Sequence, residues 1–429
     1  MMGFAEAGYA NTCGGALDDL SFEYVCTNER NWTAFDGDGD FRLAGSFANL
    51  IAALADPKAH AAALAASAAR GASGIAAAVT MRRPAAVEDK VNARLGVAVT
   101  GVEWGRGDGW VRLSLKPAAA AVAAAEVAEV EATASGCAAS SAATRSPATA
   151  CSACTPCSPP AEASFACWSA SASAGVLHGA QDPGAQPCPA GPHAEVLEAE
   201  VVVVTVPLPL LRGNVLPRFS PPLPPAKVAA AFKVEAGVAA KLLLLFEGLF
   251  PPWPANLHGA VCADCAVPEF WFRTVSGPEG SAPQHLCTGF LMGRFRDEAV
   301  ARGKAATVRL ACAQLDDMFG LGGGLGGGGG AKPSCSAALA KSALHDWGAE
   351  PFARCGYTHC PSLNGACEAD FRTLAAAVPV AGGGALLFAG EGYISAGANM
   401  TVHSALDAGH RAAGEAAAVL AARGPVSRL

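Results

Sequence analysis

The sequence LLFAGE at residues 386–391, followed after eight residues by MTVHSA at residues 400–405, is more informative than any other part of the chain. The apolar run predicts a buried strand that ends in a turn formed by Gly390 and Glu391. A short loop then leads to an alanine-rich helix that is predicted over residues 403–423. The chain is therefore expected to close with a strand, a Gly-Glu turn, a loop and a helix.

The composition limits the class of protein. A chain of 429 residues with 52% hydrophobic residues is long enough for two or three domains, or for one elaborate domain. The formal net charge of -7 argues against a general nucleic-acid binder and is compatible with a cationic substrate. No apolar run reaches the about 18 residues that would span a bilayer, and the N-terminus lacks the pattern of a signal peptide. Sixteen scattered cysteines fit no small disulfide scaffold and indicate a reducing compartment.

The first half of the chain contains strands interrupted by a long insertion. Two strands are predicted within residues 94–115, joined by the turn RGDG at residues 106–109. Residues 116–194 are rich in Ala, Ser, Pro and Cys and predict a disordered insertion. Residues 195–206 then resume as one buried strand, and the prolines of residues 207–225 predict an extended connection.

The second half alternates apolar strands with helical patterns. A strand is predicted over residues 241–247, and a helix over residues 304–319. This helix is amphipathic, and its apolar side consists of Val308, Cys312, Leu315 and Phe319. A helix is also predicted over residues 48–55, and a glycine-rich loop over residues 320–330.

Two patterns resemble cofactor or metal motifs but lack the context that such motifs need. The glycines of residues 322–327 satisfy G-x-G-x-x-G, but they follow a helix and not a strand, so a flexible linker is the better interpretation. The spacings Cys151-x-x-Cys154-x-x-Cys157 and Cys262-x-x-Cys265 lack matching ligand pairs, and we expect no metal site.

Several segments resemble the flavin-dependent amine oxidases, which include polyamine oxidases, monoamine oxidases and flavin histone demethylases. Beside the closing LLFAGE and MTVHSA, the segments that carry the resemblance are VVVVTVPLPLL at 201–211, FSPPLPPAK at 219–227, GVAAKLLLLFE at 237–247, Trp347-Gly348 and RCGY at 354–357. The sequence GSFANLI at residues 45–51 is similar to a helix entry of the polyamine oxidases and favours that branch. The resemblance extends over nearly the whole chain apart from its insertions.

The resemblance implies a site that binds FAD and an amine. Lys241 would hold a water molecule against flavin N5, and Tyr357 would form one wall of an aromatic cage around the substrate. Glu391 would accept hydrogen bonds from the ribityl or pyrophosphate-adjacent groups of FAD, and the N–H of Val402 would face the pyrimidine end of the flavin. The further FAD contacts that the resemblance implies are Val102, Pro207, Trp347, Gly390 and Thr401. Asp18, Asp19 and Glu23 are candidates, by position alone, for holding distal ammonium groups of the substrate.

The expected fold class is α/β, with a mixed substrate-binding sheet flanked by helices and the C-terminal part of a Rossmann-like FAD-binding domain. Residues 1–93 would begin the substrate domain, and residues 94–115 and 195–211 would provide strands of the FAD domain. Residues 212–380 would continue the substrate domain, and residues 381–425 would form the C-terminal FAD-contact segment. The G-x-G-x-x-G unit that begins other family members is not found in this chain, which is expected to weaken FAD binding.

The function that these features predict is oxidation of a polyamine such as spermine or spermidine, with transfer of a hydride to FAD and reduction of O2 to hydrogen peroxide. A flavin-dependent histone lysine demethylase and a truncated, non-catalytic remnant are the alternatives. The expected partners are a small polyamine and O2, with no nucleic acid and no membrane, and the oligomeric state is open. The C-terminal Ser427-Arg428-Leu429 is a conservative variant of the Ser-Lys-Leu address and predicts a peroxisomal location, with cytoplasm or nucleus as alternatives.

Overall fold

The computed structural model describes a defined subset of the chain. The described residues are 94, 96–119, 121, 195–212, 217–247, 253–263, 265–275, 283–321, 334–360, 368–394 and 399–423. Two compact units are distinguished, one made of Met1–Trp32 with Ala98–Leu429 and the other of Thr33–Val97. Apart from Val97, the first residue of β1, every element below belongs to the first unit.

The largest sheet is antiparallel and has the strand order β11-β7-β10-β9-β8. Its strands are β7 (Ala239–Glu247), β8 (Gly259–Val261), β9 (Glu269–Val275), β10 (Gln284–Met292) and β11 (Leu339–Asp346). The strand predicted over residues 241–247 is therefore confirmed as β7. Its side chains alternate between the two faces of the sheet, because successive residues of a strand point in opposite directions.

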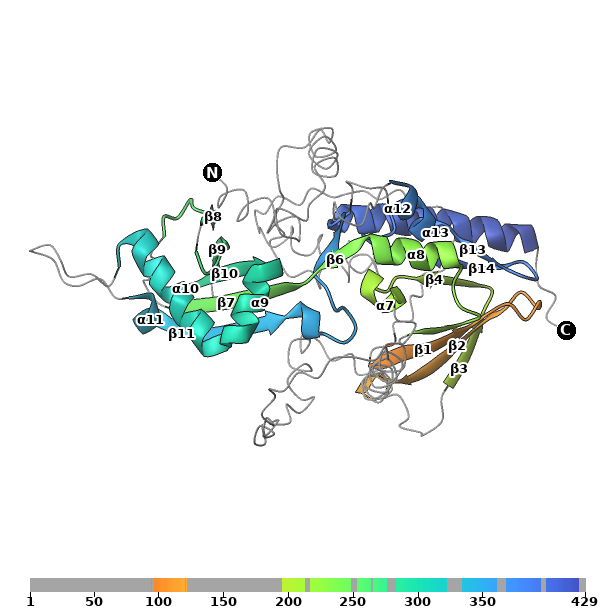
Figure 1. Cartoon of the computed structure of the whole chain (residues 1–429), viewed down its shortest axis with the longest axis horizontal. Helices are drawn as coiled ribbons and strands as arrows, with labels where there is room; N and C mark the ends of the chain where they lie inside the picture. The colour runs from red at the N-terminus through yellow and green to blue at the C-terminus, as the bar shows by residue number, and fades with distance from the viewer. Residues whose placement is uncertain are drawn as a thin grey trace, which may run out of the picture. The chain divides into compact units, whose positions relative to one another are not determined.

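One face of this sheet is covered by helices, and the other carries Lys241. Leu242, Leu244 and Phe246 of β7 are fully buried in a cluster with residues of α9 (Gly293–Arg302) and α10 (Lys304–Phe319), which lie together beside the sheet in Figure 1. The helix predicted over residues 304–319 is confirmed. Its predicted apolar side is confirmed too, since Cys312 and Leu315 are buried in the cluster and Val308 and Phe319 pack against it. The short helix α11 (Cys335–Ala338) then leads into β11.

The closing segment forms a second sheet with the order β13-β14-β4. Its strands are β4 (Val201–Val204), β13 (Val378–Val380) and β14 (Gly384–Phe388), and β14 is buried along its whole length. The final helix α13 (Val402–Arg423) packs Ala408 and Ala412 against this sheet. Small side chains allow this close approach, and the strand and helix predicted here are both confirmed.

A third sheet has the order β3-β2-β1-β5 and contains the predicted hairpin. Its strands are β1 (Val97–Glu103), β2 (Val111–Pro117), β3 (Glu195–Ala199) and β5 (Arg218–Ser220). The prediction of a single buried strand over residues 195–206 is wrong. The chain bends at Glu200, whose carboxylate lies 3.2 Å from Arg423 Nε, so that β3 pairs with β2 and β4 pairs with β14.

The proline-rich connection is also more structured than predicted. It contains β5 and the short helix α7 (Leu208–Arg212), which buries Leu208, Leu210 and Leu211, and α8 (Pro225–Lys233) begins at its end. Proline is tolerated in the first turn of a helix because its missing N–H would have no partner there. Burial of the leucines therefore outweighs the preference of the prolines for an extended chain.

The remaining elements link these sheets. They are the two-stranded pair of β6 (Glu235–Gly237) with β12 (Tyr357–His359), the 3-10 turn η4 (Trp347–Ala349) and the helix α12 (Glu368–Ala375). The combination of helices with parallel and antiparallel strands confirms the α/β class. None of the helices in the described part has both the length and the apolar character needed to cross a membrane. The helix at 48–55, most of the insertion at 116–194 and nearly all of the glycine-rich loop lie outside the described residues.

Candidate active site

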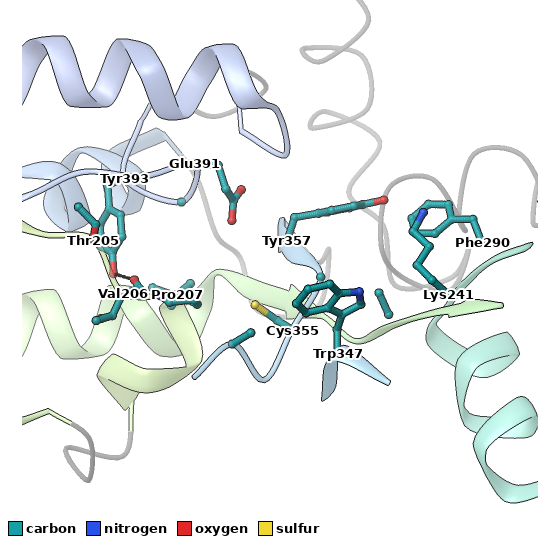
Figure 2. A pocket seen from close by; sticks show the side chains of 16 residues that line it. Thr205, Val206, Pro207, Lys241, Phe290, Trp347, Cys355, Tyr357, Glu391 and Tyr393 are labelled. Atoms are coloured by element: carbon teal, nitrogen blue, oxygen red, sulfur yellow. Dashed lines mark hydrogen bonds between the residues drawn. The ribbon is translucent and has the colours of Figure 1, made fainter. Parts of the chain in front are cut away.

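A cavity of about 380 Å³ gathers six of the nine residues predicted for the site (Figure 2). These six are Pro207, Lys241, Trp347, Tyr357, Gly390 and Glu391. The volume is in the range of small-molecule sites, and the lining is mainly apolar. The other lining residues are Thr205, Val206, Leu208, Ala239, Phe290, Ala353, Cys355, Gly356, Gly392 and Tyr393.

Lys241 lies half-buried beside Phe290. The two residues are direct cross-strand partners on β7 and β10, so their side chains share one face of the sheet. The Lys241 amine lies over the ring of Phe290, with Nζ 3.5 Å from the ring centroid (Figure 2). Burial lowers the pKa of Lys241 from 10.5 to about 8, and attraction by Glu269 opposes part of that fall. The cation–π contact also favours the charged amine.

Aromatic side chains form the walls beside this lysine. Tyr357 lies with its ring centroid 6.3 Å from that of Phe290, and Trp347 contacts His345 edge-on at 4.6 Å. The backbone comes close behind Tyr357, where Gly356 donates its N–H to the Gly237 carbonyl at 2.7 Å. A Cβ at Gly356 would lie 2.8 Å from the Ala239 side chain, so glycine permits this approach.

Glu391 ties the closing segment to β12. Its carboxylate accepts hydrogen bonds from the Thr358 N–H at 3.1 Å, the Thr358 hydroxyl at 2.8 Å and the Met400 N–H at 2.9 Å. Burial raises the pKa of Glu391 above 4.5, while these donors act in the opposite direction. Gly390 has φ +134°, a conformation that favours glycine, and so directs the chain into this turn. The carboxylate therefore links β12 to the start of α13 at the edge of the cavity.

Replacing Glu391 with glutamine is expected to loosen this link. Glutamine has nearly the same shape, but its NH2 group would face donors that now meet a carboxylate oxygen, at a cost of about 1–3 kcal/mol. Hydrogen exchange at the Thr358 and Met400 amides should accelerate in Glu391→Gln and stay unchanged in the control Glu247→Gln, which alters an exposed residue of β7. Equal protection in the parent and in Glu391→Gln would contradict this role.

Three further residues of the cavity, Tyr393, Cys355 and Phe290, were not predicted as site residues from the sequence. The Tyr393 hydroxyl donates to the Val206 carbonyl at 2.7 Å, and burial strongly raises the pKa of this hydroxyl. Cys355 is buried, and burial raises the pKa of its thiol to about 12, so it stays protonated and is unsuited as a nucleophile. Phe290 was missed as well, because the strand register that places it beside Lys241 cannot be read from either strand alone.

The other three predicted site residues lie away from the cavity lining. Val102 is a core residue of β1 with 3% exposure, paired with Phe219 of β5. Thr401 caps α13 by accepting the Ser404 N–H at 3.2 Å, and the Val402 side chain is 48% exposed at the first residue of that helix. Their contacts with FAD stay predictions, and Asp18, Asp19 and Glu23 lie outside the described residues.

His359 ends the strand that carries Tyr357 and is sensitive to pH. It is buried at 6% exposure, and Nδ1 has no hydrogen-bond partner among the described residues. Burial lowers the pKa of His359 from 6.5 to about 4, with a partial opposing effect from Glu235. The folded state therefore holds a neutral imidazole, while the unfolded chain takes up a proton below pH 6.5.

The parent protein is expected to lose about 3 kcal/mol of stability through this residue between pH 6.5 and pH 4, since each pKa unit corresponds to about 1.4 kcal/mol. The contribution is fully present above pH 6.5 and is lost as the pH falls towards the folded pKa. Urea midpoints measured across this window should depend less on pH in His359→Gln than in the parent. His410→Gln, on the exposed side of α13, should keep the pH dependence of the parent, and an identical slope in all three proteins would refute the assignment.

The cysteine and acidic residues of the described ranges form no metal centre. Within those ranges, no group of three or more His, Cys, Asp or Glu residues has an arrangement that could hold a metal ion. Cys262 and Cys265 are both free thiols there. The lining of the described cavity brings together the half-buried Lys241, the carboxylate of Glu391 and aromatic walls.

Comparison with known proteins connects this arrangement to a family. Residues 190–417 match the family described as flavin containing amine oxidoreductase, which is more than half of the chain. Peroxisomal N(1)-acetyl-spermine/spermidine oxidase from Homo sapiens is 30% identical over 240 residues, covering 52% of this chain and 43% of that protein. The chain thus spans less than half the length of this curated relative.

Solved structures of amine oxidases are also similar over part of the chain. Cyclohexylamine oxidase from Brevibacterium oxydans has a TM-score of 0.37 at 18% identity, covering 52% of this chain and 43% of that one. A putrescine oxidase bound to putrescine has a TM-score of 0.40 at 18% identity, with coverages of 52% and 45%. The family match includes β7 with Lys241, η4 with Trp347 and the Gly-Glu turn at Glu391. The chain therefore belongs to the family of flavin-containing amine oxidoreductases.

Proposed function

We propose that this protein is an FAD-dependent polyamine oxidase. The observation that carries the proposal is the cavity in which Lys241, Trp347, Tyr357 and Glu391 meet, although they come from segments far apart in the sequence. The relative that acts on acetylated spermine and spermidine, at 30% identity, favours polyamines among the amine substrates of the family.

The residues of the cavity fit a flavin. An isoalloxazine ring is flat and largely apolar, and it gains negative charge on reduction, so it suits apolar walls with a cation at one edge. The cavity offers such walls and has Lys241 as its basic residue. The start of α13 is connected to the same cavity, because the Met400 N–H donates to Glu391. The first N–H groups of a helix have no acceptor within the helix and, with the helix dipole, attract negative charge.

Bound flavin would supply the acceptor for a hydride from the carbon next to the amine nitrogen, with O2 reduced to hydrogen peroxide afterwards. The chain itself would prepare the substrate for this reaction. The same burial that lowers the pKa of Lys241 to about 8 would also disfavour a charged substrate nitrogen. Phe290, Tyr357 and Trp347 would hold the resulting neutral amine by its apolar surface.

Lys241 would serve as the hydrogen-bond donor of the site. Its amine is anchored over Phe290, and in the protonated form it can orient a water molecule next to the flavin ring. Cys355 stays protonated and Tyr393 is engaged with Val206, so neither competes as a nucleophile or base. The proposal therefore gives Lys241 the orienting role and gives the aromatic residues the task of substrate binding.

The visible absorption spectrum of the purified chain, before and after anaerobic addition of spermine, tests the proposal. A flavin band that bleaches with spermine, and not with a methylated histone peptide, is expected. Bleaching by the histone peptide alone would favour the demethylase alternative. The same measurement on the chain extended by an N-terminal dinucleotide-binding segment serves as a control. If neither protein keeps a flavin band after incubation with FAD and removal of the unbound FAD, the chain is a non-catalytic remnant and the proposal fails.

A peroxisomal location is part of the same proposal, on the basis of the C-terminal Ser427-Arg428-Leu429. A fluorescent protein carrying the last residues of this chain at its own C-terminus should accumulate in peroxisomes. Removal of the final Leu429 should abolish that accumulation. A diffuse signal from the intact fusion would exclude this address.

A further inference from the structure

Four side chains form a row across the large sheet at the level of Lys241. Glu269 of β9 pairs with Phe290 of β10, Phe290 pairs with Lys241 of β7, and Lys241 pairs with His345 of β11. Directly paired residues of neighbouring strands point to the same face of a sheet. Glu269 therefore lies on the same face as Lys241, one strand beyond Phe290.

The Lys241 side chain extends along this row in the direction of Glu269. Its Nζ lies over Phe290, which is the residue between the two, at 3.5 Å from the ring centroid (Figure 2). An extended lysine could equally turn towards His345 on the opposite side. The position of the amine over Phe290 therefore places its charge on the Glu269 side of Lys241 in this row and not on the His345 side.

Glu269 is held in a fixed position. It is buried at 5% exposure, and the Trp271 indole N–H donates to its Oε1 at 2.5 Å. A buried carboxylate is costly unless other groups stabilise its charge. The indole N–H is one such group, and the Lys241 amine across the ring is a source of opposite charge.

We propose that Glu269, held by Trp271, is the positioning residue for Lys241. Its carboxylate attracts the Lys241 ammonium across the ring of Phe290, which keeps the amine over that ring and protonated. Glu269 does not line the cavity, so it acts on the site through Lys241 and not by touching a ligand.

The other titratable groups that face Lys241 do not supply this attraction. His345 is its partner on β11, and Tyr357, Cys355 and Glu391 line the same cavity. Burial keeps the Cys355 thiol neutral, and Glu391 is bound by the donors of Thr358 and Met400. Burial lowers the pKa of Lys241, and Glu269 is the group whose attraction raises it again.

The consequence for catalysis rests on the proposed function. A lysine that orients water beside a flavin must stay protonated near neutral pH, although burial opposes its charge. Glu269 favours the protonated form of Lys241 from a position outside the cavity lining. Its carboxylate therefore attracts the Lys241 ammonium and does not bind the substrate amine. The ionisation of Lys241 can be measured on the chain without flavin.

The experiment is competitive labelling of the 429-residue chain with a trace of acetic anhydride at a series of pH values. Mass spectrometry of the peptide that contains Lys241 gives the midpoint pH of its reactivity, with Lys341 on β11 as an internal reference. Glu269→Gln should lower the Lys241 midpoint by up to about one pH unit, the lower end of the effect of a nearby opposite charge. Trp271→Phe should lower the Lys241 midpoint less, because this substitution keeps an aromatic ring on the sheet and removes only the indole N–H that donates to Glu269.

Glu247→Gln is the matched control, because Glu247 lies on the same face and the same strand as Lys241. The two lie six positions apart, about 20 Å along a strand, which exceeds the range of a screened interaction. Its Lys241 midpoint should equal that of the parent. An unchanged midpoint in folded Glu269→Gln overturns the proposal, and so does a Glu247→Gln shift of equal size. If Glu269→Gln does not fold, Glu269→Asp decides, since it withdraws the carboxylate by one methylene and should shift the midpoint in the same direction.

This experiment separates the inference from the proposed function. If the protein is colourless but Glu269→Gln lowers the Lys241 midpoint, the oxidase proposal fails and the positioning role of Glu269 is supported. A protein that contains flavin and reacts with spermine, but whose Lys241 midpoint is unchanged by Glu269→Gln, would support the oxidase proposal and refute the positioning role of Glu269.

Discussion

Replacing Lys227 with methionine is expected to destabilise the fold by about 1–3 kcal/mol, the cost of leaving buried acceptors without a hydrogen-bond donor. Lys227 is buried at 3% exposure on α8, and its amine lies 3.9 Å from the ring centroid of Phe388. It donates to three carbonyls at the C-terminal end of α12, those of Thr373, Leu374 and Ala376, at 2.8, 2.7 and 2.8 Å.

The physical reason lies in the acceptors that would remain. The last carbonyls of a helix have no partner within the helix, and here the three N–H donors of one ammonium satisfy them. Methionine fills a similar volume but has no donor, so buried carbonyls would lose their hydrogen bonds. The urea midpoint of Lys227→Met should therefore fall well below that of the parent.

Lys233→Met on the same helix is the control for this experiment. Lys233 is half exposed and lies 3.4 Å from Asp370, an ion pair of the kind that contributes at most about 1 kcal/mol. Its urea midpoint should stay close to that of the parent. Equal effects of the two substitutions would show that Lys227 acts as an ordinary surface lysine and not as the cap of α12.

Replacing Lys241 with methionine is expected to lower amine-dependent oxygen consumption by on the order of 10²-fold in flavin-loaded protein. This is the size of effect that follows when one preorganised electrostatic group is removed from an active site. The neutral side chain would keep the contact with Phe290 but would lose the donor that orients water. Oxygen uptake with spermine, under saturating substrate, measures the effect.

The stability of this variant distinguishes a functional role from a structural one. The folded pKa of Lys241, about 8, is lower than its ordinary value of 10.5, so the unfolded chain binds the proton more tightly. The stability of the parent should therefore rise as the pH increases from 8 to 10.5, and that rise should be smaller in Lys241→Met. Near neutral pH the variant should be at least as stable as the parent.

Lys341→Met, on the neighbouring strand β11, should leave oxygen uptake unchanged. A loss of activity that accompanied a loss of stability in Lys241→Met would assign the effect to folding. Unchanged oxygen uptake in a stable Lys241→Met protein would contradict the role of Lys241.

Local patterns predicted the elements that lie in long, regular segments. The period of apolar residues identified α10 with its buried side, the strand β7 and the unit of β14 followed by α13, because burial of one face imposes that period on the sequence. The resemblance to the amine oxidases predicted Lys241, Tyr357 and Glu391 as site residues, and all three line the same cavity. These residues lie in the short segments that carry the resemblance, so the sequence was sufficient to propose them.

The positions at which strands and helices begin and end depended on packing partners that are distant in the sequence. Residues 195–206 have an apolar pattern that suits one strand, yet the pairing of β3 with β2 and of β4 with β14 divides them at Glu200. The leucines of α7 overcome the local preference of their prolines because the core buries them. Local propensity amounts to fractions of a kcal/mol per residue, and burial of a large side chain outweighs it.

The sequence by itself determined the family and the α/β class, and it predicted Lys241, Trp347, Tyr357 and Glu391, which the structure brings together at one cavity. The tertiary structure alone decided that Phe290 lies under the Lys241 amine and that Glu269 occupies the next position in the same row. Cross-strand neighbours are set by the register of three strands, which no single segment encodes. The charge of Lys241 therefore depends on a residue that only the paired sheet brings near it, because electrostatic attraction acts through space and not along the chain.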